Sequence, residues 1–275
     1  MNDAGPGAAR DRGASAAQRA APWAPWAIWP AWLAAILLVL LMGPLVVVAS
    51  GTVDLGSQWR FASRDSSGQA PDPAVEAGAV VQVYGARTVH WRGAFGIHSW
   101  IVVKRSGAPE YTLYQVLGWR AYRGGRAVDI RQGATPDGRW FGEYPELLAE
   151  QRGAGVDAVI DRIEAAVASY PWPASYLAWP GPNSNTFIAH IARQVPELRL
   201  DLPPTAIGKD FLGPTTFIAA TPSGTGWQFS VYGLLGASLA WEEGLELNLM
   251  GLSAGIDVND LALRLPGIGR VGGKM

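Results

Sequence analysis

Residues 96–104 read GIHSWIVVK, an apolar run that contains one histidine, His98. Residues 111–117 read YTLYQVL, and the turn-forming segment 106–109 separates the two runs. Short runs rich in β-branched and aromatic residues, joined by a Gly/Pro turn, predict an antiparallel hairpin. We therefore expect an antiparallel sheet with His98 on one of its strands.

Further strands are predicted before and after this hairpin. Residues 80–85, VVQVYG, have the composition of a strand, and another ribbon is expected to turn at residues 124–125 before residues 139–142. Near the C-terminus, residues 227–240 and 245–256 are apolar runs, and their alternation of leucine with polar residues favours strands. The three glutamates of this region argue against a second membrane crossing.

Two helices are predicted after the first strands. Residues 155–169 carry apolar side chains at helical spacing, at Val156, Val159, Ile160, Ile163 and Val167. Pro171 and Pro173 end this helix, because proline cannot continue it. A second helix is expected over residues 184–194, with Asn183 or Ser184 as its N-cap. Strands and helices together predict the α+β class, an antiparallel sheet with packed helices.

One segment has the properties of a membrane span. Residues 31–49 contain no charge, and at about 1.5 Å per residue a helix of this length crosses the hydrocarbon core. Tryptophans suited to the headgroup level occur around its start, at Trp23, Trp26, Trp29 and Trp32. The alternative is a signal peptide cleaved near residues 48–50, but the apolar run exceeds the usual length of about 7–15 residues. A retained anchor is therefore the favoured interpretation.

The charges on either side of the span predict its orientation. Arg10, Arg12 and Arg19 precede it, whereas Arg60 is the first basic residue after it, so the positive-inside rule places the N-terminus in the cytoplasm. We expect four parts: a disordered cytoplasmic tail over residues 1–30, a transmembrane helix over 31–50, a linker over 51–75 and an extracytoplasmic α+β domain over 76–275.

Composition excludes several classes of function. A chain of 275 residues with 49% hydrophobic residues can build a sizeable core, and its net charge of −1 argues against a nucleic-acid partner. The absence of cysteine removes disulfides, thiolate nucleophiles and cysteine-ligated metals. The histidines and carboxylates show no metal-ligand spacing, so we expect neither a metal site nor a cofactor.

One pair of segments predicts a catalytic site. Ser184 at a helix start lies where backbone N–H groups and the positive end of the helix dipole meet, and His98 on a neighbouring strand can act as its base. Asn183 and Asn185 are the expected contacts to substrate or oxyanion. Either Tyr114 or Gln115 on the paired strand is expected to orient the imidazole, depending on the register. The simpler alternative is that Asn183 and Ser184 only cap the helix and that His98 is a buried, hydrogen-bonded histidine.

A strand histidine followed much later by Asn183-Ser184-x-x-Phe187 resembles the circularly permuted branch of the NlpC-type, papain-like superfamily, which includes lecithin-retinol-acyltransferase-like proteins. The resemblance implies a papain-like fold in which His98 is the base. Ser184 occupies the place of the family's cysteine, and a serine depends more strongly on a well-placed base.

A wider resemblance rests on the motifs GIHSWI, GPNSNTF, EGLELNL and LPGIGR. Together they are similar to an uncharacterised bacterial membrane family, the domain of unknown function 3750, over most of residues 80–272. This resemblance implies a bacterial cell-envelope protein in the cytoplasmic (inner) membrane. It implies no activity.

Three functions follow as hypotheses. The first is a serine-type hydrolase or acyltransferase that acts on a lipid or cell-wall ester or amide through Ser184 and His98. The second is an inactive papain-like domain that binds a lipid or cell-wall fragment. The third is an envelope interaction module, which predicts an exposed apolar edge or patch around residues 227–256. Whether a base reaches Ser184 distinguishes the first hypothesis from the second.

Overall fold

The computed structural model describes residues 28–56 and 61–273. Helix α1 (Ile28–Ala49) contains the predicted span, and it is long and apolar enough to cross a membrane. The predicted tail, with its arginines and the first two tryptophans, lies almost wholly in residues 1–27, outside the described residues. Residues 37–275 form one compact unit, and the fold described next belongs to it.

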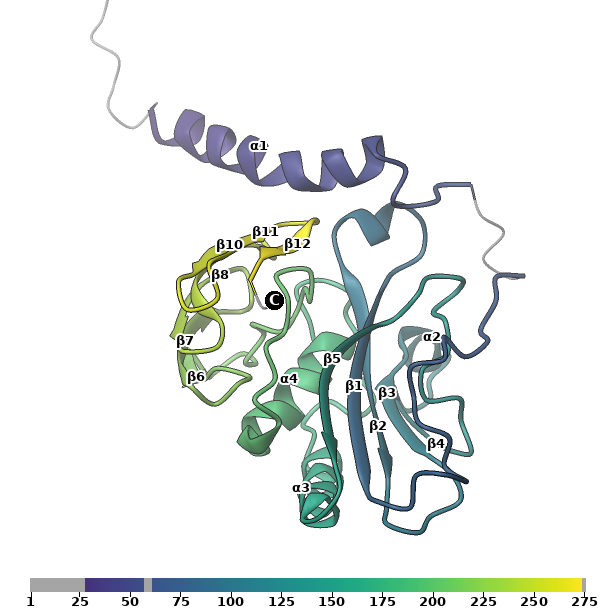
Figure 1. Cartoon of the computed structure of the whole chain (residues 1–275). Coiled ribbons are helices and arrows are strands. Elements are labelled where there is room, and N and C mark those ends of the chain that lie inside the picture. The colour runs from purple at the N-terminus through teal and green to yellow at the C-terminus, as the bar shows by residue number, and fades with distance from the viewer. Residues whose placement is uncertain (1–27, 57–60, 274–275) are drawn as a thin grey trace, which may run out of the picture. The chain divides into compact units, whose positions relative to one another are not determined.

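The first sheet is antiparallel and has the strand order β4-β3-β2-β1-β5 (Figure 1). Its strands are β1 (Val80–Arg87), β2 (Ile97–Lys104), β3 (Thr112–Val116), β4 (Val128–Gln132) and β5 (Glu146–Arg152). The predicted hairpin is β2 with β3, and its register places Ile101 opposite Tyr114. Because side chains alternate along a strand, this register determines which residues share a face.

Two helices cover one face of the first sheet. Helix α3 (Val156–Ala168) and helix α4 (Ser184–Gln194) contribute the fully buried Ile160, Ile163, Ile188 and Ile191 to the main core. Alternate strand residues such as Val83 on β1 and Ile101 on β2 meet them there. Both helices were predicted from their spacing and are confirmed.

The opposite face of the first sheet has its own smaller core under loops. Tyr84, Trp100 and Val102 are buried on this face, with the partly buried Trp140 packed against them. The segment that precedes β1 also contacts this region, because Asp137 accepts hydrogen bonds from the hydroxyls of Ser66 and Ser67. The described part of the expected linker is therefore hydrogen-bonded to the domain, and the predicted domain bounds stay a prediction.

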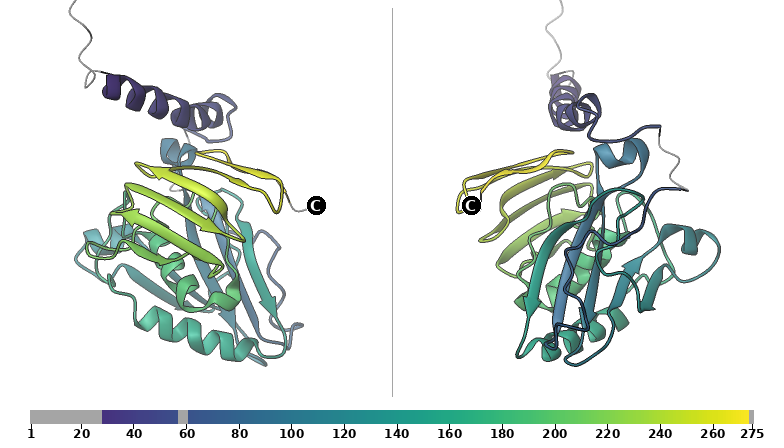
Figure 2. Two further views of the ribbon diagram at one scale, coloured as in Figure 1. Left: turned by 90° about the vertical axis from the view of Figure 1, so that its left-hand side faces the viewer. Right: turned by 45° about the vertical axis from the view of Figure 1, so that its right-hand side comes forward.

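A second sheet follows α4, and all of its strands are connected as a meander (Figure 2, left, yellow and green). It contains β6 (Ile218–Ala220), β7 (Gly226–Val231), β8 (Leu235–Ala240), β9 (Gly244–Leu249), β10 (Leu252–Asp257), β11 (Ala262–Leu265) and β12 (Gly269–Gly272). Short helical turns complete the fold, at η2 (His90–Ala94), α2 (Gly118–Tyr122) and η3 (Pro196–Leu198).

The predicted α+β class, with antiparallel sheets and one N-terminal apolar helix, is confirmed. One local prediction is wrong. The turn at Gly124 and Gly125 follows the short helix α2 rather than a strand, and residues 139–142 form no strand. Their backbone instead bonds to the preceding segment, with Arg139 N donating to Asp65 O and Gly142 N to Ser63 O.

Candidate functional site

The position of His98 on β2 decides whether the predicted catalytic pair can exist. Its neighbours Ile97 and Ser99 both bond to Asn185 of α4, through the Ile97 carbonyl at 3.0 Å and the Ser99 hydroxyl at 2.8 Å. His98 itself stacks on Trp140, with ring centroids 3.7 Å apart, on the loop-covered face. Because successive strand residues point to opposite faces, His98 points away from α4.

The hydrogen bonds of His98 fix its protonation. Gln115 donates from Nε2 to Asp129 at 3.0 Å, so its oxygen faces His98 Nε2, also at 3.0 Å. The imidazole therefore carries its proton on Nε2 and leaves Nδ1 as an acceptor. Asp129 is held by Arg120 at 2.6 Å and Arg131 at 2.7 Å. Burial lowers the pKa of His98 to about 4, because a buried imidazolium loses its hydration.

Capping bonds occupy two of the N–H groups at the start of α4. The Asn183 side chain accepts from the backbone N–H groups of Asn185 and Thr186, at 2.9 and 3.1 Å. Its Nδ2 donates to the carbonyls of Ala178 and Ile207. Asn185 Nδ2 likewise donates to the Ile207 carbonyl, at 2.8 Å. The N–H groups of Asn185 and Thr186 and the side chains of both asparagines are thus already bonded to the protein, which leaves them unavailable to an oxyanion.

The predicted catalytic residues are consequently divided between two places. Ser184 is buried, and no hydrogen bond joins its hydroxyl to His98 or to any other described residue. Gln115 lies beside His98, whereas Tyr114 points to the helix face and donates to Glu164 at 3.3 Å. The expected Ser184–His98 pair is not assembled, because the two side chains belong to opposite faces of the first sheet. The papain-like catalytic arrangement has no support in this geometry.

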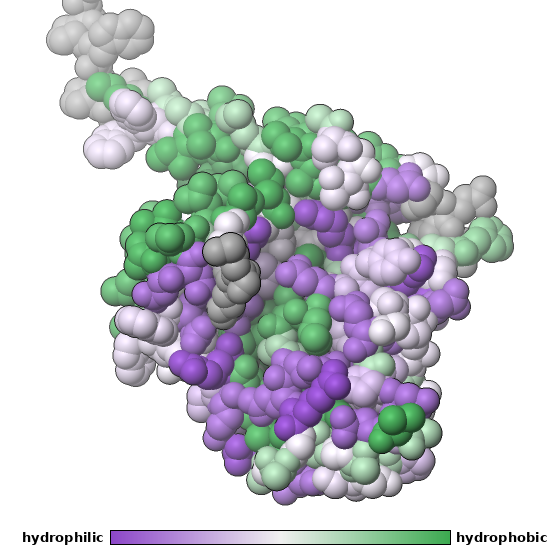
Figure 3. All heavy atoms as spheres, in the orientation of Figure 1, coloured by the Kyte–Doolittle hydropathy of each residue, from purple (hydrophilic) through white to green (hydrophobic). Residues whose placement is uncertain are grey.

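The most unusual surface is on the second sheet, on the face turned away from α4. Ten large apolar side chains on its strands are exposed, namely Ile218, Trp227, Phe229, Leu235, Leu239, Leu245, Leu247, Ile256, Leu263 and Val271. We call this surface the apolar face. In space-filling view, hydrophobic residues gather at the upper left, over the strands of this sheet (Figure 3).

The register arranges the apolar face in rows. One row crosses six adjacent strands, in the order Trp227, Leu239, Leu245, Ile256, Leu263 and Val271. A second row contains Ile218, Phe229, Ala237, Leu247 and Ala254. Alternation therefore directs every apolar strand residue of these rows to one side. With strands about 4.8 Å apart, the longer row extends for roughly 25 Å.

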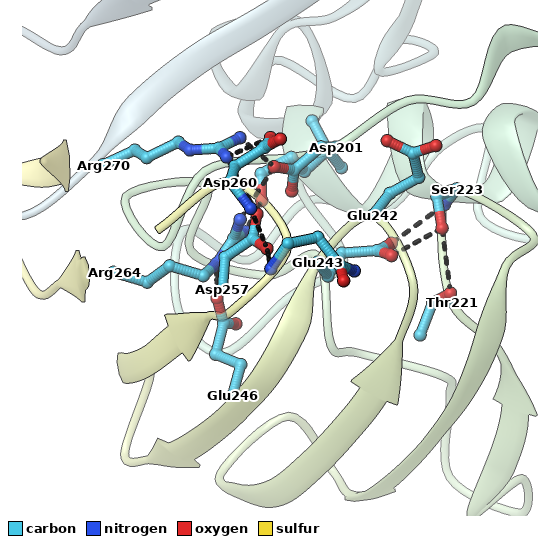
Figure 4. Close-up of polar contacts among 12 residues, drawn as sticks. Asp201, Thr221, Ser223, Glu242, Glu243, Glu246, Asp257, Asp260, Arg264 and Arg270 are labelled. Atoms are coloured by element: carbon cyan, nitrogen blue, oxygen red, sulfur yellow. Dashed lines mark hydrogen bonds and ion pairs between the residues drawn. The ribbon is translucent and has the colours of Figure 1, made fainter. Parts of the chain in front are cut away.

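The opposite, inward face of the second sheet is polar and charged (Figure 4). Arg264 is fully buried and donates to Glu246 at 2.8 Å, to Asp201 at 2.8 Å and to the Leu202 carbonyl at 2.7 Å. Glu246 also pairs with the buried Lys209. Arg270 joins Asp201 to Asp257 on the same side. The sheet is thus inverted relative to an ordinary sandwich, with ion pairs inside and leucines outside.

Sequence reasoning did not predict this inversion. Leu245-Glu246-Leu247-Asn248-Leu249 indicated a strand, and the usual expectation is that leucines face the core. The available signal was the presence of charged residues between leucines on two strands, with Glu246 between Leu245 and Leu247 and Arg264 between Leu263 and Leu265. Among residues 28–56 and 61–273, no three histidine or carboxylate side chains are placed to hold a metal ion.

Comparison with known families matches residues 78–211 to the model described as "Protein of unknown function (DUF3750)". The match includes the first sheet, α3, α4 and the loop that carries Lys209, and it ends before the second sheet. No curated protein and no solved structure matches the chain. Residues 78–211 are therefore similar to this family of unknown function.

Proposed function

We propose that this protein is a membrane-anchored interaction domain that lies with its apolar face on the lipid surface to which α1 anchors it. The observation that carries the proposal is the row from Trp227 to Val271, which is apolar across six strands. Monomeric proteins rarely expose contiguous apolar patches larger than a few hundred Å², and larger ones mark membrane or protein contacts.

A lipid surface is the binding partner that we favour for the apolar face, because α1 tethers the domain close to the membrane. Helix α1 ends at Ala49, and Val53 is already buried in the folded unit, clustered with Ala94. Four residues extend to roughly 14 Å at most. If α1 spans a bilayer, the domain begins within this distance of the membrane surface. A domain held so close presents its apolar surface to lipid at high effective concentration.

The chemistry of the face fits lipid. No strand position of the two rows carries a charge, and aromatic rings at Trp227 and Phe229 are suited to the interfacial region. Each half-exposed leucine or isoleucine contributes on the order of 1 kcal/mol when it leaves water. The ten side chains of the apolar face, seven of them leucine or isoleucine, together supply about 10 kcal/mol before the cost of immobilisation, which suffices to keep a tethered domain on the surface.

The proposal also includes the orientation of the protein in the inner membrane. Three arginines before the span and none directly after it support an N-terminus in the bacterial cytoplasm. The domain then acts on the extracytoplasmic side of the inner membrane. A serine hydrolase is the less supported function, because His98 faces away from Ser184 and the N–H groups of Asn185 and Thr186 are capped.

The test uses the absence of cysteine in the chain. Leu247→Cys, on the apolar face, and Ile130→Cys, on β4 of the first sheet, replace side chains of similar exposure, 60% and 54%. Each full-length variant is labelled with an environment-sensitive NBD dye and reconstituted in vesicles with doxyl-labelled lipids. We expect strong quenching at position 247 and little at position 130.

Two outcomes contradict the proposal. Equal, weak quenching at both positions means that the apolar face does not contact lipid. A blue-shifted but unquenched dye at position 247 means that another protein surface, such as a second copy, covers the face. Crosslinking of Leu247→Cys to itself then identifies that second copy.

A further inference from the structure

A small pocket lies on the α4 side of the second sheet, opposite to the apolar face, between α4 and the segment that leads into β6. Its volume is about 200 Å³. The helix contributes Thr186, His190, Arg193 and Gln194 to the wall, and the other side consists of Pro171, Trp172, Phe211, Leu212, Thr216 and Ala219. The wall is mainly apolar, and it contains one permanently charged group, Arg193.

Arg193 has neutral partners only. Its Nε donates to the Ala220 carbonyl at 3.0 Å, and its Nη2 donates to the Lys209 carbonyl and the Gln228 side chain, both at 2.7 Å. Within the described residues, no carboxylate forms an ion pair with Arg193, and its Nη1 makes no hydrogen bond. Burial lowers the pKa of Arg193 to about 10. Arg193 lines the pocket and keeps one guanidinium nitrogen, Nη1, without a hydrogen bond to the described residues.

Asp210 and Glu243, the carboxylates that act electrostatically on Arg193, form their hydrogen bonds with other residues. Asp210 accepts from Asn248 at 2.7 Å and lies 3.7 Å from Lys209, while Glu243 accepts from the backbone of Ser223 at 2.9 Å. Neither residue lines the pocket. Asp210 and Glu243 act on Arg193 electrostatically, and neither forms a direct ion pair with it. Among the described pocket residues, Arg193 is thus a partly exposed cation without a hydrogen-bonded carboxylate.

The remaining wall suits an alkyl chain. Trp172 and Phe211 meet edge to face, with ring centroids 5.3 Å apart, and Leu212 extends this apolar surface. Ala219 lies on β6, whose neighbouring residue Ile218 belongs to the apolar face. Because successive strand residues point to opposite faces, the pocket lies behind the edge strand β6, on the side of the sheet that faces α4.

We propose that this pocket binds an amphiphilic anion, a single carboxylate or phosphate attached to an alkyl chain, with the anionic group on Arg193 and the chain against Trp172 and Phe211. The inference rests on the proposed function, because a domain held at a lipid surface lies where amphiphiles are concentrated. Guanidinium groups recognise both carboxylate and phosphate through paired N–H donors.

Titration calorimetry on the full chain in phosphatidylcholine nanodiscs tests this inference, with empty discs as the blank. The probes are octyl phosphate, octanoate, octanol and inorganic phosphate. We expect saturable binding of the two octyl anions and at least tenfold weaker binding of octanol and inorganic phosphate. Discs that contain phosphatidic acid form a second arm: if lipid is the source, they compete with octyl phosphate, and if free amphiphiles are, they do not.

Two variants and a control make the result specific. Arg193→Gln removes the charge, and Ala219→Phe fills the pocket while it keeps Arg193, so a folding defect of either one does not end the test. Each variant should lose at least tenfold in affinity for octyl phosphate. Arg162→Gln, at an exposed ion pair on α3, should bind like wild type. Unchanged affinity in a folded Arg193→Gln or Ala219→Phe variant, or equal binding of octanol, overturns the inference.

This result is separable from the lipid contact of the apolar face. Quenching at position 247 without octyl-anion binding refutes the pocket alone. Octyl-anion binding without quenching refutes the proposed function and shows that the pocket is filled from solution.

Discussion

At the scale of single residues, His98 is informative because its surroundings define its chemistry. Gln115 holds the Nε2–H, Trp140 covers one ring face, and burial keeps the imidazole neutral. The result is a rigid base with no nucleophile in hydrogen-bond contact. Such a group contributes to stability in a manner that depends on pH.

The first prediction concerns that dependence. The pKa of His98 is about 4 in the folded protein and near 6.5 in the unfolded chain, so the unfolded state binds more protons between these values. Stability should therefore fall as the pH drops from 6.5 towards 4, by roughly 2–3 kcal/mol from this residue. Urea unfolding of wild type and His98→Gln at pH 7 and 4.5 measures it. A variant with the same loss as wild type contradicts the assignment.

The second prediction concerns Ser184. A serine needs a base within about 2.6–3.2 Å in a productive pose, and His98 lies on the other face of the sheet. A fluorophosphonate probe should therefore label wild type and Ser184→Ala to the same background level. Labelling that disappears only in Ser184→Ala restores the hydrolase hypothesis.

At the scale of elements, the start of α4 is a complete capping box, with Asn183 accepting from Thr186 N and Thr186 Oγ1 accepting from Asn183 N. The sequence predicted the helix over residues 184–194 and left its N-cap open between Asn183 and Ser184, because capping is a local property of a few residues. The partner of the imidazole was left open between Tyr114 and Gln115, since one residue of register changes the face.

The orientation of the second sheet was not predictable by the same means. Alternation reveals that a strand has two different faces, and it does not reveal which face is inside. Here Arg264, Lys209 and Glu246 come from positions 18 to 55 residues apart, and only the folded chain brings them together. Ion pairs between residues far apart in the sequence therefore determine which face of the sheet is inside, and the local alternation does not.

The third prediction tests the cap. Asn183→Ala removes two bonds to the helix start and leaves the carbonyls of Ala178 and Ile207 without this donor. We expect a loss of about 2 kcal/mol in the free energy of unfolding. The adjacent Ser184→Ala serves as the control and should change stability by less than about 0.5 kcal/mol. Equal losses in the two variants contradict the capping role.

The fourth prediction tests the inverted sheet. Glu246→Gln leaves Lys209 and Arg264 as buried cations that lack their shared carboxylate, so unfolding should become easier by about 3–5 kcal/mol. The neighbouring Glu242→Gln weakens a pair with the largely exposed Arg199 and should cost less than about 1 kcal/mol. Urea titration of both variants gives the comparison. Similar effects in the two mean that burial does not govern the pair.

At the scale of the whole molecule, three parts follow one another along the chain. They are an apolar helix, the segment 78–211 that matches the family, and the inverted sheet. The stability of the sheet depends on the segment 78–211, since Lys209 and Asp201 of this segment form ion pairs with Glu246 and Arg264. We therefore expect the two parts to unfold together. In the proposed arrangement, α1 tethers both parts to the same bilayer.

The fifth prediction concerns topology. Alkaline phosphatase fused after residue 275 should be active, because the charges around α1 predict that the domain lies outside the cytoplasm. A green fluorescent protein that folds only in the cytoplasm should stay dark at the same position. The reverse pattern contradicts the orientation and leaves the lipid contact to be tested on the cytoplasmic leaflet.

The strands at the two ends of the second sheet are short, with three residues in β6 and four in β12. A short border offers few unpaired backbone groups to a neighbouring strand. If the apolar face lies on lipid as proposed, neighbouring copies have little backbone with which to join their second sheets edge to edge. The face then attaches the protein to the bilayer, while the borders favour copies that diffuse separately.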